Sequence, residues 1–241
     1  MTTKGFAIIP MNSPKEMVEK LAYLGFRTYK TIGLSELDER VKYHTDLQCH
    51  LLANGVIVVA PVVYNYYKDI LSQENISVIK GDTNPRSPYP YDILYNIKAF
   101  ESFIMGRLDH IDQSLLNTYK ELNYETINVT QGYTGCSILT DGKTFAISSD
   151  KKILESLKER GLSTLEIGRG DVHLEGFKHG FIGGASGYFE GTVYFTGRFS
   201  KEREVIVERF LRDLDIDFLY LSDGKIVDLG GMYFRRDQWI R

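Results

Sequence analysis

The hydrophobic positions of the chain follow a strand, helix, strand pattern. Residues 145–148, Phe-Ala-Ile-Ser, form a short apolar run typical of a buried strand. Residues 151–160 follow, and Ile153, Leu154 and Leu157 recur there at the 3.6-residue period of an amphipathic helix, with lysine and glutamate between them. A β-rich run then ends in Ile-Gly. The pattern predicts a strand, a helix and a second strand in succession.

This pattern occurs five times. Residues 143–168 can be laid over residues 4–33, because both read Phe-Ala-Ile, a polar loop, an amphipathic helix, a Gly and a run that ends in Ile-Gly. Further copies lie at 55–81, 102–129 and 192–221. A repeat at this spacing indicates one structural unit used several times. The first strands of the five units begin near residues 6, 57, 103, 145 and 193.

Additional strands are expected to form hairpins with these units. Asn-Gly or Asp-Gly between two apolar runs is a strong hairpin signal. The three such turns are Asn54-Gly55, Asp141-Gly142 and Asp223-Gly224. A ββαβ unit leaves sheet edges open, and a closed ring of units hides them. We therefore predict an α/β fold in one domain over residues 1–241, an alpha-beta propeller of five ββαβ-type repeats around a pseudo-five-fold axis with a central channel.

Composition narrows the class of protein. The chain has 43% apolar and 25% charged residues, which is ordinary for a packed soluble domain. Its net charge of −3 lacks the basic bias of proteins that bind nucleic acid, so that partner is not expected. No window has the apolar length of a signal peptide core or a membrane span. We expect a cytoplasmic protein without a membrane partner, in which Cys49 and Cys136 are reduced thiols.

The connection between the fourth and fifth units, residues 170–187, holds six glycines and several groups capable of acid–base chemistry. The glycines alone fit tight turns and close backbone approach. A functional interpretation places polar side chains at the channel mouth, with an acid orienting an imidazole. The segment lacks the spacing of a nucleotide-binding loop, and no cofactor is expected. Its candidate residues are Asp171, His173, Glu175, Lys178 and His179.

Residues 43–52, YHTDLQCHLL, offer a second polar group. In a strand, His44, Asp46, Gln48 and His50 would share one face while Cys49 points to the other, which excludes Cys49 from their site. Such a face fits the lining of the central channel, or else a solvated strand face. The spacing matches no established metal motif, so no metal is expected.

Two further features could belong to a site. Cys136 follows two glycines in QGYTGCS, and it is either a small buried hydrophobe or a nucleophile that needs a base such as His44 or His173 within hydrogen-bond reach. Residues 81–96 form the longest irregular stretch and contain Asp92. Long loops of this kind are often functional, although a Tyr-rich loop also packs on a surface without a ligand.

The repeat pattern resembles, over nearly the whole chain, the pentein fold of the guanidino-group-modifying superfamily of deiminases, dimethylargininases and amidinotransferases. HLEGFKHG is similar to a His-Leu segment of those enzymes, and the resemblance implies that His173 is the general acid/base. Their cysteine nucleophile follows a Gly-Gly pair near the C-terminus, whereas here Gly230-Gly231 precede Met232 and Tyr233. HTDLQ, QGYTGCS and GFIGGASG are similar to an uncharacterised bacterial group of this fold that lacks that cysteine.

Two functional hypotheses follow. In the first, the protein binds or modifies a small guanidino or amino-acid-like substrate in the axial channel, as a hydrolase or transferase acting on a C–N bond. His173 with Asp171 or Glu175 is then the acid/base, and Cys136 is the only thiol available for attack. The expected substrate contacts are His44, Asp46, Gln48, Asp92, Lys178 and His179. In the second hypothesis, the ring is catalytically inactive and serves as a binding or interaction module for a protein or the ribosome.

Overall fold

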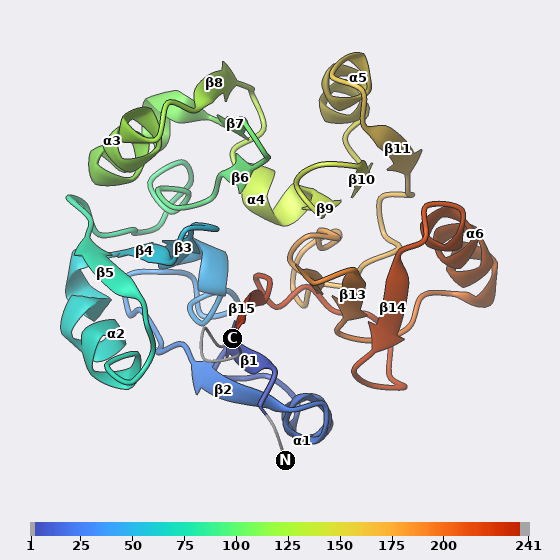
Figure 1. The fold of residues 1–241 in the computed structure, drawn as a ribbon, viewed down its shortest axis with the longest axis horizontal. Helices are drawn as coiled ribbons and strands as arrows, with labels where there is room; N and C mark the ends of the chain where they lie inside the picture. The colour runs from blue at the N-terminus through green and yellow to red at the C-terminus, as the bar shows by residue number, and fades with distance from the viewer. Residues whose placement is uncertain (1–2, 237–241) are drawn as a thin grey trace.

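The computed structural model describes residues 3–236 of the chain. Five three-stranded sheets are arranged in a ring, with the longer helices at its periphery (Figure 1). This is the α/β propeller that the five repeats predict. Each sheet has a central strand, a parallel strand on one side and an antiparallel strand on the other.

The elements of the five units correspond one to one. The central strands are β1 (Gly5–Ile9), β4 (Val56–Val59), β7 (Phe103–Gly106), β10 (Phe145–Ser148) and β13 (Thr192–Phe195). The peripheral helices that follow them are α1 (Lys15–Tyr23), α2 (Tyr64–Ile70), α3 (Gln113–Glu121), α5 (Lys151–Glu159) and α6 (Lys201–Arg212). The parallel strands are β2 (Phe26–Lys30), β5 (Ser77–Lys80), β8 (Glu125–Asn128), β11 (Ser163–Glu166) and β14 (Asp217–Tyr220).

The antiparallel strands, which we call the inner strands, are β3 (Cys49–Leu51), β6 (Lys98–Ala99), β9 (Leu139–Thr140), β12 (Ser186–Phe189) and β15 (Tyr233–Arg236). Short helical turns are η1 (Thr45–Leu47), η2 (Pro61–Val63), η3 (Leu108–His110) and α4 (Thr134–Ser137). The inner strand of the first unit comes from the other end of the chain, because β15 pairs with β1. The C-terminal strand thus closes the ring.

Local sequence explains the units well. In α5, Ile153, Leu154 and Leu157 are buried while the lysines face outward. Asp150 caps this helix, since its carboxylate accepts hydrogen bonds from the amides of Lys152 and Ile153, a contact that typically contributes about 1 kcal/mol. The first strands begin at or one residue before the predicted positions.

The three predicted hairpins have different outcomes. Two form, β3 with β4 and β9 with β10, and Gly55 and Gly142 have positive φ in their turns. The third prediction, at Asp223-Gly224, is wrong. The residues directly after Gly224 do not pair with β14, the strand before the turn; Lys225 and Val227 form isolated parallel bridges to Arg198 and His173. The chain then continues to the first unit and supplies β15.

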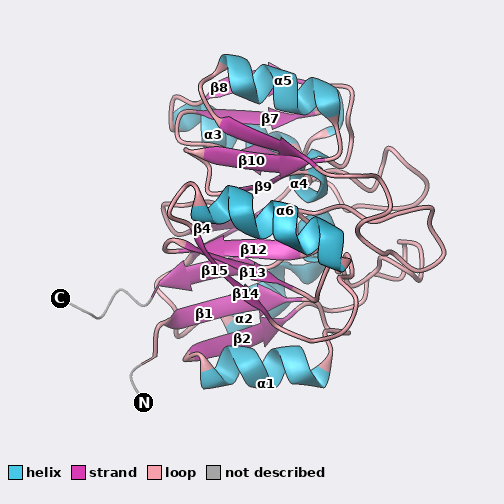
Figure 2. Cartoon of the chain, turned by 90° about the vertical axis from the view of Figure 1, so that its right-hand side faces the viewer, coloured by secondary structure: helices cyan, strands magenta, loops and turns pink. Residues whose placement is uncertain are grey.

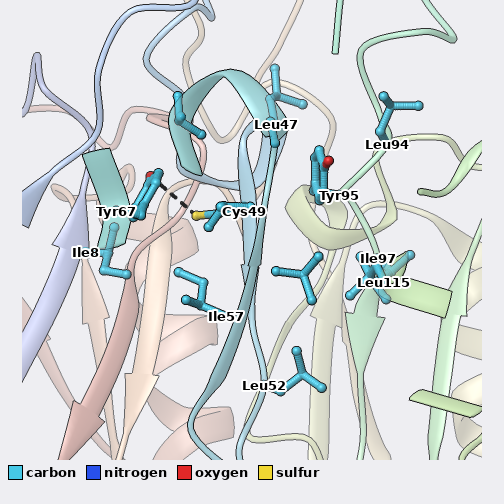
Figure 3. Close-up of a cluster of buried hydrophobic side chains, with 14 of the residues drawn as sticks. Ile8, Leu47, Cys49, Leu52, Ile57, Tyr67, Leu94, Tyr95, Ile97 and Leu115 are labelled. Carbon is cyan, nitrogen blue, oxygen red and sulfur yellow. Dashed lines mark hydrogen bonds between the residues drawn. The ribbon is translucent and has the colours of Figure 1, made fainter. Parts of the chain in front are cut away.

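Cys49 lies in the largest hydrophobic cluster, between the second sheet and α2 (Figure 3). Its sulfur contacts the hydroxyl of Tyr67, among apolar neighbours such as Ile57 and Leu47. The side chain of Cys49 is fully buried in this cluster, and the Tyr67 hydroxyl that it contacts also donates to Gln48 of the polar group at 43–52. The exclusion of Cys49 from a site at 43–52 stays a prediction.

The two sides of the ring differ. The central strands end on the side where the long irregular connections lie, which we call the loop side; it includes residues 31–48, 81–97 and 167–185 (Figure 2). The opposite, turn side carries the tight turns at Gly55 and Gly142. Within residues 3–236, no helix has the length and apolar character needed to cross a membrane.

Candidate functional site

A pocket of about 500 Å³ opens on the loop side, and we call it the loop-side pocket. The segment that precedes each inner strand contributes to it, so all five units converge there. Its polar and ionisable lining includes His44, Asp92, Tyr133, Cys136, Lys178, His179 and Asp228. Its apolar lining includes Val41, Leu47, Pro88, Tyr89, Leu174, Phe177 and Phe181.

Asp228 is a buried carboxylate held by the backbone. Its Oδ1 accepts from the amide of Gly230 at 2.9 Å, and its Oδ2 accepts from the amide of Phe181 at 2.8 Å. Gly184 packs directly on this carboxylate, where a Cβ would lie 2.5 Å from the Asp228 Cγ. Burial raises the pKa of Asp228, while His44 and the two amides oppose that shift. Gly184, which packs on the carboxylate, and Gly230, which donates to it, therefore position the Asp228 side chain.

His44 is only 5% exposed and lies against Gly230. Gly230 has φ of +84°, and a Cβ there would overlap the His44 side chain and Cα. A glycine is thus required at this position both by the backbone conformation and by close approach. Burial lowers the pKa of His44, and the nearby Asp228 only partly offsets this. The imidazole of His44 is therefore neutral and lies beside the buried carboxylate of Asp228.

Cys136 lies in α4, buried at the floor of the loop-side pocket. Its S–H donates to Oδ2 of Asp46, and Nδ2 of Asn96 donates to its sulfur at 3.0 Å. Burial, followed by the charges of Asp46 and Asp228, raises the pKa of the thiol well above its usual range. Burial also raises the pKa of Asp46 to about 7. The groups that contact the sulfur are a carboxylate and an amide, and not an imidazole.

Asp92 is the second buried acid of the pocket. Its Oδ2 accepts from the hydroxyl of Tyr133 at 2.7 Å, whereas its buried Oδ1 has no hydrogen-bond partner. Burial raises the pKa of Asp92, with the Tyr133 hydroxyl opposing the shift. Buried acceptor atoms are nearly always paired in folded proteins. Asp92 also lines the loop-side pocket, so its carboxylate is a candidate contact for a donor from outside the chain.

Aromatic rings form one wall. Tyr89 and Tyr133 have ring centroids 5.6 Å apart, and Tyr133 and Phe181 follow at 6.1 Å. Two exposed rings, Tyr89 and Phe177, stand at the rim. The pocket thus combines acids with aromatic faces, a lining that suits a small cation.

The structure separates the sequence-predicted residues of 170–187 into two groups. Lys178 and His179 line the pocket, with the field of His179 acting on Asp228. His173 and Glu175 are exposed, and the backbone of His173 bridges Val227. Within residues 3–236, no hydrogen bond joins the carboxylate of Asp171 to the imidazole of His173. Asp171 instead accepts from the Gly168 amide and pairs with Arg203.

The reading of residues 43–52 as one continuous strand is wrong. The chain forms the turn η1 at 45–47 before β3 begins, and the amide of Asp46 in this turn donates to the carbonyl of Gly230. His44 and Asp46 reach the channel. Gln48 does not line the loop-side pocket and is used internally, donating to the carbonyls of Ile32 and His44.

Sequence reasoning missed two members of the group around Cys136 and Asp92. Asp228 gives a usable signal, since it is the only acid in the apolar run before Gly230-Gly231. Tyr133 gives none, because only the ring brings its segment to Asp92. In the part of the chain that the structure describes, no three His, Cys, Asp or Glu residues are grouped so that they could hold a metal ion.

Solved structures with this arrangement include three at low identity. A C. jejuni agmatine deiminase with substrate bound shares 11% identity at a TM-score of 0.56, covering 98% of this chain and 94% of that one. An amidinotransferase of the saxitoxin biosynthetic pathway from Microseira wollei shares 11% identity at a TM-score of 0.58, covering 99% of this chain and 96% of that one. DDAH from Pseudomonas aeruginosa, complexed with citrulline, shares 7% identity at a TM-score of 0.54, covering 97% of this chain and 100% of that one.

These likenesses establish the class: the chain has the pentein fold, as its repeats predict. It belongs to the family of unknown function DUF6873, which matches residues 8–233. No curated protein matches the chain.

Proposed function

We propose that the loop-side pocket binds a small organic cation of the guanidino or amidino class. The observation that carries this proposal is the unpaired Oδ1 of Asp92, a buried carboxylate oxygen in a pocket that also contains Asp228. A planar amidinium presents N–H donors in a fixed geometry that matches carboxylate oxygens. Its charge would also offset the burial that raises the pKa of both acids.

The walls of the pocket support the same class of ligand. Tyr133 and Phe181 offer ring faces, whereas Tyr89 already has the guanidinium of Arg107 over its ring. Cations bind favourably over such faces. The structures of similar fold include an agmatine deiminase with substrate bound and DDAH complexed with citrulline. Ligands of this kind fit a pocket of about 500 Å³.

A second candidate function is hydrolysis or group transfer at a C–N bond, and the contact between Cys136 and Asp46 favours it. In this step the sulfur of Cys136 bonds to the amidinium carbon while its proton passes to Asp46, and the C=N electron pair moves to nitrogen. Asp46 then returns the proton to an amine, which leaves as the C=N bond re-forms and the carbon stays bonded to sulfur. Water in hydrolysis, or an acceptor amine in transfer, bonds to that carbon, gives up a proton and releases the Cys136 thiol. The raised pKa of the thiol opposes the first step, so binding is the primary proposal.

The experiment is calorimetric titration with methylguanidinium, with the uncharged isostere methylurea as its matched ligand. We expect methylguanidinium to bind and methylurea to bind much more weakly. Asp92→Asn removes a charged acceptor, and it should weaken methylguanidinium binding about 10- to 100-fold, as expected for a charge-assisted hydrogen bond worth roughly 1.5–3 kcal/mol. Asp69→Asn, on the exposed face of α2, is the control and should bind like the native protein.

Equal affinity for methylguanidinium and methylurea would refute the proposal, as would an unchanged affinity in Asp92→Asn with its melting temperature preserved. Release of ammonia or methylamine during the titration, abolished by Cys136→Ser, would establish the second candidate. Binding without release would mean that the pocket only binds.

A further inference from the structure

A second cavity opens on the turn side of the ring, opposite the loop-side pocket. It has a volume of about 570 Å³, and we call it the turn-side pocket. Residues of all five inner strands line it, including those at the turns near Ala53 and Gly142. The binding proposal above uses none of this cavity, and the second candidate function shares only Asp46 with it.

Two cations line the turn-side pocket without a carboxylate partner. Lys98 makes one hydrogen bond, a long one of 3.4 Å from its Nζ to the carbonyl of Gly135. Arg235 donates from Nη1 to the carbonyl of Ala53. Among residues 3–236, neither has a carboxylate oxygen within 4 Å, the range in which Arg236 meets Glu190. A half-buried cation without a counter-ion is costly, because burial removes its water.

Arg235 is also fixed in place. A Cβ on Gly55 would lie 2.6 Å from its Nη2, so the guanidinium rests on the backbone of the hairpin turn between β3 and β4. The glycine leaves room for this close approach, and the Ala53 carbonyl holds the group from the side. A guanidinium fixed in this way loses little freedom when it binds an anion.

The turn-side pocket also contains two acids. The carboxylate of Asp141 accepts from the amides of Lys143 and Thr144 in its own turn. Asp46 accepts the thiol proton of Cys136 through Oδ2, while its buried Oδ1 has no hydrogen-bond partner. Asp46 acts on Lys98 only from beyond ion-pair distance, and burial lowers the pKa of Lys98 to about 8 despite it. Because the lining holds three cations, Lys98, Arg235 and Arg236, beside these two acids, its net charge is positive.

We propose that the turn-side pocket is a binding site for a small anion, a carboxylate or phosphate group held by Arg235 and Lys98. The planar fork of Arg235 suits both groups, since each offers two oxygens to parallel N–H donors. Lys98, in β6, supplies a second charge to the lining. The site is independent of the loop-side pocket, apart from the contact between Asp46, which lines the turn-side pocket, and Cys136, which lines the other.

The test is calorimetric titration of the full chain with malonate and with inorganic phosphate, at low ionic strength in a zwitterionic buffer. We expect at least one anion to bind, and the stronger of the two identifies the group. Arg235→Gln should weaken binding by roughly tenfold or more, the usual effect of losing a charge-assisted pair. Lys98→Met keeps the length and apolar stem of the side chain and should weaken binding similarly.

The control variant is Lys80→Met at the end of β5, which should leave anion binding unchanged. Melting curves of each variant show whether the ring is intact. The proposal is overturned if neither anion binds, or if folded Arg235→Gln and Lys98→Met both bind like the native chain. Asp92→Asn should leave anion binding unchanged, and Arg235→Gln should leave methylguanidinium binding unchanged, so that the failure of one site is distinguished from that of the other.

Discussion

Substitution of Gly184 by alanine should both destabilise the ring and disorder the loop-side pocket. An added Cβ would lie 2.5 Å from Cγ of Asp228 and 2.9 Å from its Oδ2, with its Oδ1 closer still. Gly184 is fully enclosed, since its amide donates to the carbonyl of Cys136 and its carbonyl accepts from the amides of Leu229 and Gly231. The backbone is thus held from both sides, and either it or the carboxylate must move.

The cost can be bounded for each response. If the backbone shifts, overpacking of this kind costs about 1–3 kcal/mol. If the Asp228 carboxylate turns away, it loses the amides of Gly230 and Phe181, and hydrogen bonds to a charged group contribute about 1.5–3 kcal/mol each. Because the protein takes the cheaper response, a loss of about 1–3 kcal/mol is expected, which lowers the melting temperature of a chain this size by about 2–12 °C.

The assay is thermal unfolding followed by circular dichroism, together with methylguanidinium titration. Gly224→Ala is the matched control, because its nearest atom would be the Ser222 hydroxyl at 3.4 Å, an ordinary contact. We expect that variant to melt within about 3 °C of the native protein. A Gly184→Ala protein that melts as high as Gly224→Ala and binds methylguanidinium normally would refute the assignment of Gly184 to the support of Asp228.

Two further predictions concern the buried acid and thiol. Alkylation of Cys136 by iodoacetamide should be slow at neutral pH and should accelerate with rising pH, because burial and the charges of Asp46 and Asp228 raise the pKa of the thiol. Mass spectrometry in a Cys49→Ala background measures the rate. A fast rate that does not depend on pH would contradict the prediction. The folded-state pKa of Asp46, about 7 against a usual 3.8, means that folding favours its protonated form, so its contribution to stability is full at low pH and is lost as pH rises through 7. Asp46→Asn should therefore lose less unfolding free energy between about pH 4 and pH 7 than the native protein does. Urea denaturation at each pH measures this loss. An equal loss in the two proteins would count against the raised pKa.

The fold could be predicted from the sequence because its information is local. The apolar stripe of 151–160 and the Asn54-Gly55 turn each act over a few residues, and the repetition of such signals defines a ring. The failure at Asp223-Gly224 is instructive, since the turn signal there matches the other two. What differs is that the segment after the turn bridges Arg198 and His173 and then supplies β15 to the first sheet, and no short window of sequence contains these partners.

The site was harder to predict, because the residues that contact one another in it lie far apart in the sequence. Cys136 and Asp46 are separated by 90 positions in sequence, and Asn96 by 40 from the cysteine, so nothing local indicates that they meet. His173 illustrates the opposite error. Its surroundings match a sequence motif, yet the backbone bridge to Val227 leaves its side chain exposed, while His179, six positions later, lines the pocket.

The ring geometry explains how residues far apart in the sequence line one pocket. A segment precedes each inner strand, and all five of these segments contribute to the loop-side pocket. After Gly230-Gly231 this chain has Met232, which is buried in another hydrophobic cluster, whereas Cys136 precedes β9 and lines the loop-side pocket. Asp46, which precedes β3, contacts the Cys136 sulfur, while Asp228 precedes β15 and lines the pocket itself. Different units therefore supply the groups of this site, and its chemistry must be judged from the pocket rather than from the position of any one motif.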